Sequence, residues 1–273
     1  MKLSVIFTTY NSPVWLEKVL WGYYCQDYKD FEVLIADDGS TPETVDVIKK
    51  MKQKTNLEIK HVWHEDRGFR KCEILNKAII ASESEYLIFS DGDCIPRKDF
   101  IQTHFENKRE NYFLSGGAVR LPMSLSKLIK TEHILSQDAF NKEWSLKNEL
   151  KQSFLKNIKL TKNKFLSQVM NKLSTTKATW NGGNASAWKK DILSVNGFDE
   201  RMRYGSEDRE FGERLINAGI KEKQIRYSAI CIHLDHSRGY MNQKDLDNNA
   251  AIRNETKVQK KVWTDFGIIK SAS

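Results

Sequence analysis

The chain has 273 residues, which allow one large domain or two closely packed ones, and its 40% apolar and 11% aromatic residues are enough for a substantial core. No run of about 18 uncharged apolar residues occurs, so the sequence encodes no transmembrane helix. The apolar run that ends at Phe7 is too short for a signal peptide. The four cysteines are widely spaced and form no Cys-x-x-Cys pair, which argues against a zinc site or a disulfide framework. We expect a globular, cytoplasmic protein with buried or incidental thiols.

The first 122 residues alternate strand and helix patterns with short connections. Strands of this part are predicted at 3–8, 31–36, 58–63 and 85–90, and helices at 14–26, from Pro42 behind Thr41, and at 71–81. Strands separated by helices of this length favour right-handed crossovers. Residues 112–120 are predicted to add a further strand. The expected fold class is therefore α/β, with a Rossmann-like, mostly parallel sheet flanked by helices.

The strand predicted at 85–90 ends in two carboxylates, Asp91 and Asp93, separated by Gly92. Ligands of open α/β sheets gather where such strands end, so both side chains are expected in a crevice. The glycine lets the backbone turn tightly there. Two carboxylates suit a hard divalent cation, Mg²⁺ or Mn²⁺, which is usually shared with a phosphate-bearing substrate. Taken alone, the same residues also fit an ordinary acidic surface turn.

Residues 121–178 differ in composition from the rest of the chain. They hold eleven lysines and no arginine against four acidic residues, which gives +7 of the total formal charge of +8. Apolar residues recur at helical spacing, first at 146, 150, 154 and 158 and then at 165, 169, 170 and 173. The segment is predicted to be helical. It fits a hairpin with a solvated lysine face, or a basic amphipathic surface that faces anionic lipid or an acidic acceptor.

Glycine and carboxylate motifs return after residue 178. Trp180 precedes a turn at Gly182-Gly183, whose paired glycines allow a close backbone approach. Glu207 and Asp208 precede a helix predicted at 209–218, where the helix dipole favours ionised carboxylates even if they only cap the helix.

The last part of the chain contributes two histidines. A strand is predicted at 225–234, and His233 and His236 lie at its end, although both also fit surface positions. The tail is predicted to form a polar helix at 247–262.

Six motifs in fixed order, over about residues 3–120 and 179–238, carry a resemblance to known enzymes. The motifs are Val5-Ile6-Phe7-Thr8-Thr9-Tyr10-Asn11, Asp37-Asp38-Gly39-Ser40, Asp91-Gly92-Asp93, Gly182-Gly183-Asn184, Gly197-Phe198-Asp199 and Gly205-Ser206-Glu207-Asp208. The chain resembles family 2 glycosyltransferases with the GT-A fold. Its second part is similar to the C-terminal segment of galactosyltransferase-type enzymes.

The resemblance implies a role for each matching residue. It places Thr8 and Tyr10 beside the uracil of a UDP-sugar, with Asp38 bonding the base and Asp91 on the ribose or metal side. It makes Asp93 a metal ligand and Asp208 the catalytic base. The His-Ser-Arg at 236–238 resembles a metal-ligand motif, which favours His236 over His233 as a further ligand.

The chemistry of glycosyl transfer agrees with these residue types. Charge builds on the leaving diphosphate while the sugar becomes oxocarbenium-like, so a divalent metal on Asp93 and a histidine would neutralise the leaving group. Asp208 would take the proton of the acceptor hydroxyl. A single displacement inverts the anomeric centre. Glu207, Gly183 and Trp180 are expected at the acceptor, with Trp180 stacking on a sugar face unless it is a core residue.

Two departures from the family pattern stand out. Leu75 precedes Asn76, where many relatives carry an arginine, and this leaves Arg70 or Lys71 to supply the positive charge. The basic segment at 121–178 matches no part of the family pattern, so the acceptor is undetermined by the resemblance.

The predicted function is a transferase that moves a hexose or N-acetylhexosamine to a glycan or lipid-linked glycan, as in surface polysaccharide or lipopolysaccharide synthesis. The expected division of the chain is 1–120 for the nucleotide-sugar half, 121–178 for a basic helical insertion, 179–240 for the acceptor half and 241–273 for a helical tail. The enzyme is expected in the cytoplasm, peripherally on the inner membrane face through 121–178. No nucleic-acid partner is expected, because the lysines lack interleaved arginines. A metal-dependent nucleotidyltransferase or phosphohydrolase and a non-enzymatic basic membrane adaptor are the alternatives.

Overall fold

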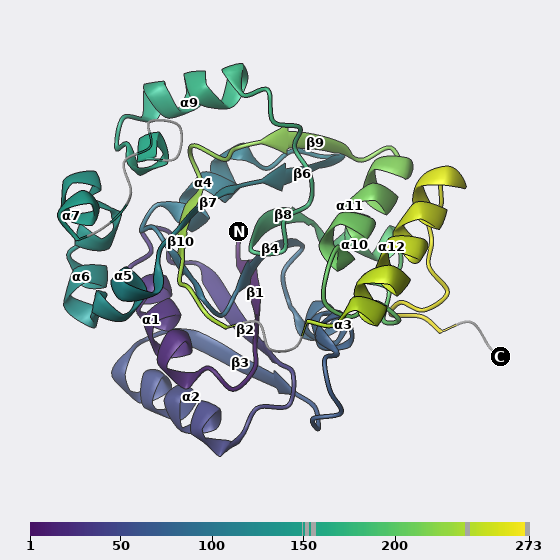
Figure 1. Ribbon diagram of the computed structural model, residues 1–273, viewed down its shortest axis with the longest axis horizontal. Helices are drawn as coiled ribbons and strands as arrows, with labels where there is room; N and C mark the ends of the chain where they lie inside the picture. The colour runs from purple at the N-terminus through teal and green to yellow at the C-terminus, as the bar shows by residue number, and fades with distance from the viewer. Residues whose placement is uncertain (149, 151–152, 154–156, 238–240, 271–273) are drawn as a thin grey trace.

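The computed structural model describes residues 1–148, 150, 153, 157–237 and 241–270, and within them the central sheet has seven strands (Figure 1). Their order is β3-β2-β1-β4-β8-β6-β9. The first four are parallel, β8 is antiparallel to both of its neighbours, and β9 is parallel to β6. The strands are β1 (Leu3–Thr9), β2 (Phe31–Asp37), β3 (Glu58–Trp63), β4 (Tyr86–Asp91), β6 (Tyr112–Ser115), β8 (Asn184–Trp188) and β9 (Lys221–Gln224). The predicted mostly parallel α/β sheet is confirmed.

Helices cover both faces of this sheet and enclose two apolar cores. Successive strand residues point to opposite faces, so Val5 and Phe7 of β1 lie in one core and Ile6 lies in the other. The first core includes residues of α1 (Pro13–Tyr24), α2 (Pro42–Lys54) and α4 (Phe100–Asn107). The second includes residues of α3 (Lys71–Ala81), α10 (Lys189–Ser194) and α11 (Glu207–Asn217).

A smaller sheet, in the order β5-β10-β7, is formed by β5 (Cys94–Pro96), β7 (Gly117–Arg120) and β10 (Ile230–His233). β5 follows the Asp91-Gly92-Asp93 turn directly, and β10 pairs with β5 so that His233 lies opposite Cys94. The strand predicted at 225–234 is therefore shorter than expected. Its first half is a turn, because the carbonyl of Ile225 accepts hydrogen bonds from the N–H groups of Ser228 and Ala229.

Segment 121–178 is helical where the structure describes it, but it is not a hairpin. Its elements are short: α5 (Met123–Leu128), α6 (Thr131–Leu135), η1 (Asp138–Phe140), α7 (Lys142–Lys147), η2 (Ile158–Leu160) and α9 (Lys164–Leu173). Buried apolar residues of its first half, including Leu125, Ile134 and Phe140, join the first core, so this half belongs to the main body. Phe154 of the predicted apolar pattern lies outside the described residues.

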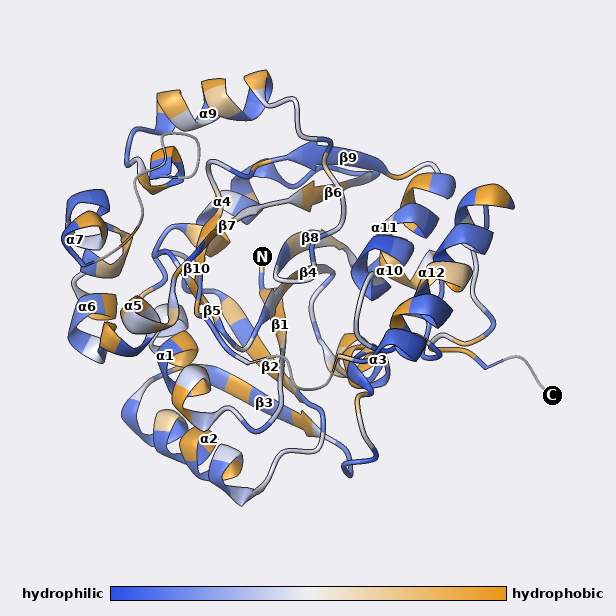
Figure 2. Cartoon of the chain, viewed as in Figure 1, coloured by the Kyte–Doolittle hydropathy of each residue, from blue (hydrophilic) through white to orange (hydrophobic). Residues whose placement is uncertain are grey.

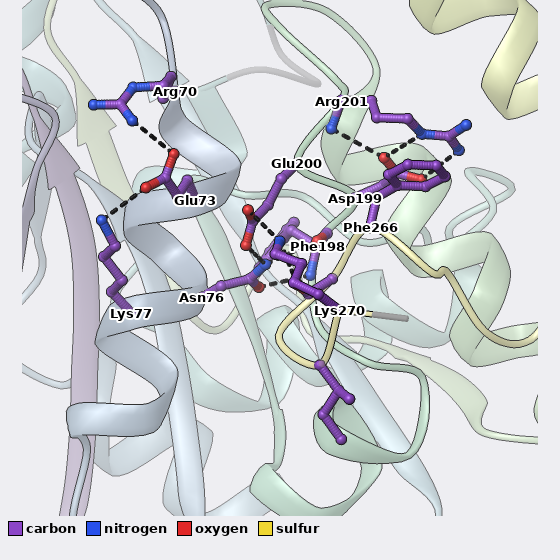
Figure 3. Close-up of polar contacts among 12 residues, drawn as sticks. Arg70, Glu73, Asn76, Lys77, Phe198, Asp199, Glu200, Arg201, Phe266 and Lys270 are labelled. Atoms are coloured by element: carbon purple, nitrogen blue, oxygen red, sulfur yellow. Dashed lines mark hydrogen bonds and ion pairs between the residues drawn. The ribbon is translucent and has the colours of Figure 1, made fainter. Parts of the chain in front are cut away.

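The C-terminal part packs against the second half of the fold. The tail helix predicted at 247–262 is α12 (Gln243–Val258), which begins and ends four residues earlier, and the chain then returns along the loop at 196–201. Asn196 donates to the carbonyls of Thr264 and Ile269 and accepts from the N–H of Ile269. Figure 3 shows the neighbouring contacts of this loop.

A buried amide joins this loop to α3. Asn76 accepts from the N–H of Phe198 and donates to the Phe198 carbonyl and to Glu200, at 2.8, 2.9 and 2.9 Å (Figure 3). Gly197 makes this approach possible, since a Cβ there would lie 2.4 Å from Oδ1 of Asn76. Asn76 thus links α3 to the loop at 196–201. Across the described part of the chain, none of the helices combines the length and the apolar character needed to cross a bilayer.

Candidate active site

A cleft of about 550 Å³ lies where β1 and β4 end, at the position that the strand pattern predicts. Most of the residues proposed from the sequence line it. They are Thr8, Tyr10, Asp38, Asp91, Asp93, Gly183, Glu207, Asp208 and His236, and His233 is beside them. Arg70 and Trp180 are not among the lining residues.

One carboxylate and two imidazoles converge on one side of this cleft. His236 Nε2 lies 3.0 Å and His233 Nε2 3.7 Å from Oδ2 of Asp93. One potential ligand atom from each of the three residues lies within 4.8 Å of the others, which suits a single metal ion. The structure therefore brings both histidines to Asp93, with the predicted ligand His236 the nearer of the two.

The hydrogen bonds of His236 show that a positive charge belongs between it and Asp93. Its Nδ1 lies 2.8 Å from the carbonyl of Ser237 and its Nε2 faces the Asp93 carboxylate, so both ring nitrogens meet acceptors. The neutral ring can donate only once, so the contact needs a second proton or a cation that Nε2 and the carboxylate share. Burial raises the pKa of Asp93, but the histidines outweigh it, and the pKa is lowered overall.

Lys71 lies between the carboxylate of Asp91 and that of Glu207 at the start of α11. Its Nζ donates to Oδ1 of Asp91 at 2.9 Å and lies 3.9 Å from Oε1 of Glu207. Burial lowers the pKa of Lys71, but the two carboxylates outweigh burial and raise it. Lys71 is therefore a cation in an acidic cleft, and its hydrogen bond holds the Asp91 carboxylate in position.

Glu207 and Asp208 enter the cleft because the residue before them adopts an unusual backbone. Ser206 has φ +68°, a left-handed conformation that a non-glycine residue rarely adopts, and such strain is common at functional sites. Glu207 is buried and accepts from the N–H of Gly205, and burial raises its pKa. Asp208 is half-buried, and its Oδ2 accepts one long bond, 3.3 Å, from the N–H of Gly182.

Asp38 is fixed before any ligand arrives. Its Oδ1 lies 2.7 Å from Nε2 of His64, and its Oδ2 accepts from the backbone N–H of Arg70 at 2.9 Å. Nδ1 of His64 lies 3.2 Å from Nζ of Lys77, so the ring accepts there and donates to Asp38. Burial raises the pKa of Asp38, against the effect of these two donors.

Two residues proposed from the sequence do not face the cleft. Trp180 is completely buried, with its ring 4.7 Å from that of Phe211 and 5.3 Å from that of Phe89, so it cannot stack on an acceptor. The guanidinium of Arg70 donates to Glu73 and to the Glu65 carbonyl (Figure 3 shows the first contact). Lys71, the other candidate, supplies the cation instead.

The sequence reasoning missed three contributors to the site. His64 holds Asp38, while Arg120 lines the cleft beside its register partner His233. Phe69 also lines the cleft. The pairing of β2 with β3, in which Asp37 lies opposite Trp63, places the next residues, Asp38 and His64, side by side. Only that register would have revealed His64, and strand patterns carry no register between parallel strands.

Comparison with known proteins agrees with this geometry. Glycosyl transferase family 2 matches residues 4–170, more than half of the chain. The chain belongs to this family. The N-terminal domain of galactosyltransferase matches residues 165–237, which carry Asp208 and both histidines. Because the two matches together run through 121–178, the expectation that this segment lies outside the family pattern is wrong.

Relatives and solved structures of the family cover much of the chain. It is 28% identical to the chondroitin synthase of Escherichia coli over 82% of its length, and 26% identical to the GalNAc(5)-diNAcBac-PP-undecaprenol beta-1,3-glucosyltransferase of Campylobacter jejuni over 76%. The alignments span 33% and 57% of those two proteins. The S. aureus TarS structure in complex with UDP-GlcNAc superposes with a TM-score of 0.61 at 18% identity, over 92% of this chain and 64% of that one. This likeness confirms the GT-A fold.

Proposed function

We propose that the protein is an inverting, metal-dependent glycosyltransferase that moves a hexose or N-acetylhexosamine from a UDP-sugar to a hydroxyl of a glycan. The observation that carries the proposal is a single cleft lined by a three-residue metal site, Asp93 with His233 and His236, and by the carboxylate of Asp208. These are the two groups that the chemistry needs, one for the leaving diphosphate and one for the attacking hydroxyl.

The metal site fits Mn²⁺ better than Mg²⁺. Its potential ligands are one carboxylate oxygen and two imidazole nitrogens. Mg²⁺ prefers oxygen ligands and keeps its waters, whereas a mixed nitrogen and oxygen set suits a transition metal. When bound, the ion would neutralise the charge that develops on the departing diphosphate.

The transfer step follows from the remaining residues. The acceptor oxygen forms a bond to the anomeric carbon while the bond from that carbon to the diphosphate oxygen breaks, so UDP leaves and the configuration inverts. Oδ2 of Asp208, with its one long hydrogen bond, accepts the hydroxyl proton. Glu207 bonds a neighbouring acceptor hydroxyl, and Lys71 holds Asp91 in place for the donor. Gly183 brings its backbone against Asp91, where a Cβ would lie 2.8 Å from Oδ2.

The substrates are proposed from the site and the relatives together. Asp38 is an acceptor held by two donors and suited to the imide N–H of uracil, with Thr8 and the exposed Tyr10 nearby in the cleft. The binding of UDP-GlcNAc by TarS and the lipid-linked acceptor of the C. jejuni relative support a UDP-sugar donor and a surface polysaccharide or lipid-linked acceptor.

Replacement of one carboxylate oxygen of Asp208 by an amide nitrogen tests its proposed role as the base. Asp208→Asn keeps the size of the side chain but cannot accept a proton, so kcat should fall by about 10² or more while UDP–Mn²⁺ binding persists. Glu207→Gln is the matched control on the same helix turn, and its effect should be mainly on acceptor KM. Near-normal turnover of Asp208→Asn would assign the base to Glu207 instead.

Nucleotide and metal preference can be measured without an acceptor. UDP with Mn²⁺ should raise the melting temperature well above the shifts given by GDP or CDP, because ligand binding stabilises the folded state. EDTA should remove both this shift and sugar transfer. Equal shifts for the three nucleotides would contradict base recognition by Asp38, and release of phosphate without sugar transfer would favour a phosphohydrolase.

A further inference from the structure

Helix α9 lies at the outer edge of the molecule, away from the two apolar cores (Figure 1). It begins behind Asn163, whose side chain accepts from the N–H of Leu166. Its attachment to the body is polar: Asn171 donates to Oγ of Ser228 at 2.7 Å and accepts from the N–H of Tyr227 at 2.8 Å. Ser167, one turn earlier on the same face, is buried.

The outward face of α9 is apolar, the reverse of an ordinary surface helix. Phe165 is 75% exposed, Leu173 is 70% exposed and Leu166 is 36% exposed, and Val169 lies on the same stripe. Positions 165, 169 and 173 follow one another at intervals of four residues, so they line one side of the helix. Figure 2 shows that α9, at the molecular edge, alternates hydrophobic and hydrophilic positions. The helix therefore turns small polar residues inward and large apolar residues outward.

Lysines border this stripe, and no acidic residue offsets them. Residues 150–178 contain seven lysines and neither aspartate nor glutamate. Four of the lysines, Lys162, Lys164, Lys172 and Lys177, are exposed, and none forms an ion pair with another residue of the described ranges. The segment thus combines an exposed apolar stripe with exposed lysines and no acidic residue of its own.

We propose that α9 docks the enzyme on an anionic phospholipid bilayer. The apolar stripe would enter the boundary between headgroups and acyl chains, and the four lysines would lie at the level of the lipid phosphates. A soluble polyanion would use the same lysines but would have no use for Phe165 and Leu173. The membrane is therefore the occupant that accounts for both features. The inference does not depend on the proposed function, because docking is measured without donor or acceptor.

Two sets of substitutions test the two features separately in the full chain. One variant combines Phe165→Ser with Leu173→Ser, and the other replaces the four lysines with glutamine. All six side chains are exposed, so both variants should keep the melting temperature of the wild type. The matched controls are Val258→Ser, at a side chain that is 73% exposed on α12, and Lys52→Gln with Lys54→Gln on α2.

Sedimentation with vesicles of phosphatidylglycerol and phosphatidylcholine in equal parts is the readout. The wild type and the controls should bind, and each α9 variant should bind at least about tenfold more weakly. Binding to heparin should fall only in the lysine variant. No wild-type binding to these vesicles, or vesicle binding of the serine variant equal to that of the wild type, would overturn the proposal. In the second case, a heparin interaction lost with the lysines would make the surface a site for a soluble polyanion.

Discussion

His104 on α4 makes the stability of the protein sensitive to mild acid. Its side chain is completely buried, with Nδ1 at 2.7 Å from Oγ of Ser186 and Nε2 at 3.0 Å from Oδ1 of Asn184. Burial lowers the pKa of His104 from 6.5 to about 4. The imidazole is therefore neutral in the folded protein at pH values where it is already charged in the unfolded chain.

The size of the effect follows from this difference. A lowered pKa contributes stability that is present above 6.5, and this stability is lost as the pH falls towards 4, where the folded state must also bury a charge. The contribution of His104 at neutral pH, about 3 kcal/mol relative to pH 4, should disappear over that range. Urea denaturation at a series of pH values would measure the loss as a change in the free energy of unfolding.

The matched variant is His104→Gln, which keeps a hydrogen-bonding group but does not titrate. It should be less stable than the wild type at pH 7.5, because the fit to Ser186 and Asn184 is worse. Its free energy of unfolding should depend less on pH between 6.5 and 4, so the two curves converge. Parallel curves would refute the reasoning. Asn184 also donates to the carbonyls of Gly117 and Ala229, so the buried histidine is linked through it to the small sheet.

Two further predictions concern the glycine turn and α11. Two variants of the glycine turn should differ in steady-state kinetics. Gly183→Ala should lower kcat at least tenfold, because its Cβ would lie 2.8 Å from Oδ2 of Asp91. Gly182→Ala should keep the wild-type kcat, because its Cβ would have no contact closer than 3.6 Å. Arg214→Met should lower the free energy of unfolding by about 3–5 kcal/mol in urea denaturation, because it leaves the buried Glu210, now paired at 2.8 Å, without its cation. The double variant Arg214→Met with Glu210→Met should regain part of this loss, and a loss below about 1 kcal/mol for the single variant would contradict the reasoning.

The sequence alone predicted the sheet and most of the site because both depend on local patterns. The helix at 71–81 was predicted with its observed bounds, and the apolar run before Asp91 was correctly predicted to be a buried strand. Parallel strands then bring their carboxyl ends to one edge, which assembles the acidic residues without any knowledge of side-chain directions.

The errors at the site concern side-chain directions that only tertiary packing decides. Arg70 and Lys71 are neighbours at the start of α3, and which of them faces the cleft depends on the rotation of the helix against the sheet. Trp180 precedes a turn that lines the cleft, but its own side chain packs against α11. Gly212 on α11 leaves space for it, since a Cβ at 212 would lie 2.5 Å from the Cβ of Trp180. The preference for His236 as the metal ligand stays a prediction, since His233 lies at the end of β10 and both histidines lie near Asp93.

The contacts of Asn196 have a consequence for the evolution of the family. Its side chain satisfies backbone groups of Thr264 and Ile269, and a Cβ on Gly267 would lie 1.8 Å from its carbonyl oxygen. Asn196 thus holds the segment at 264–269, about 70 positions later in the chain, and none of the residues of this segment lines the cleft. We expect Asn196 and Gly267 to be retained or lost together among homologues, and substitutions that shorten or lengthen the connection after α12 to be accompanied by changes in the loop at 196–201.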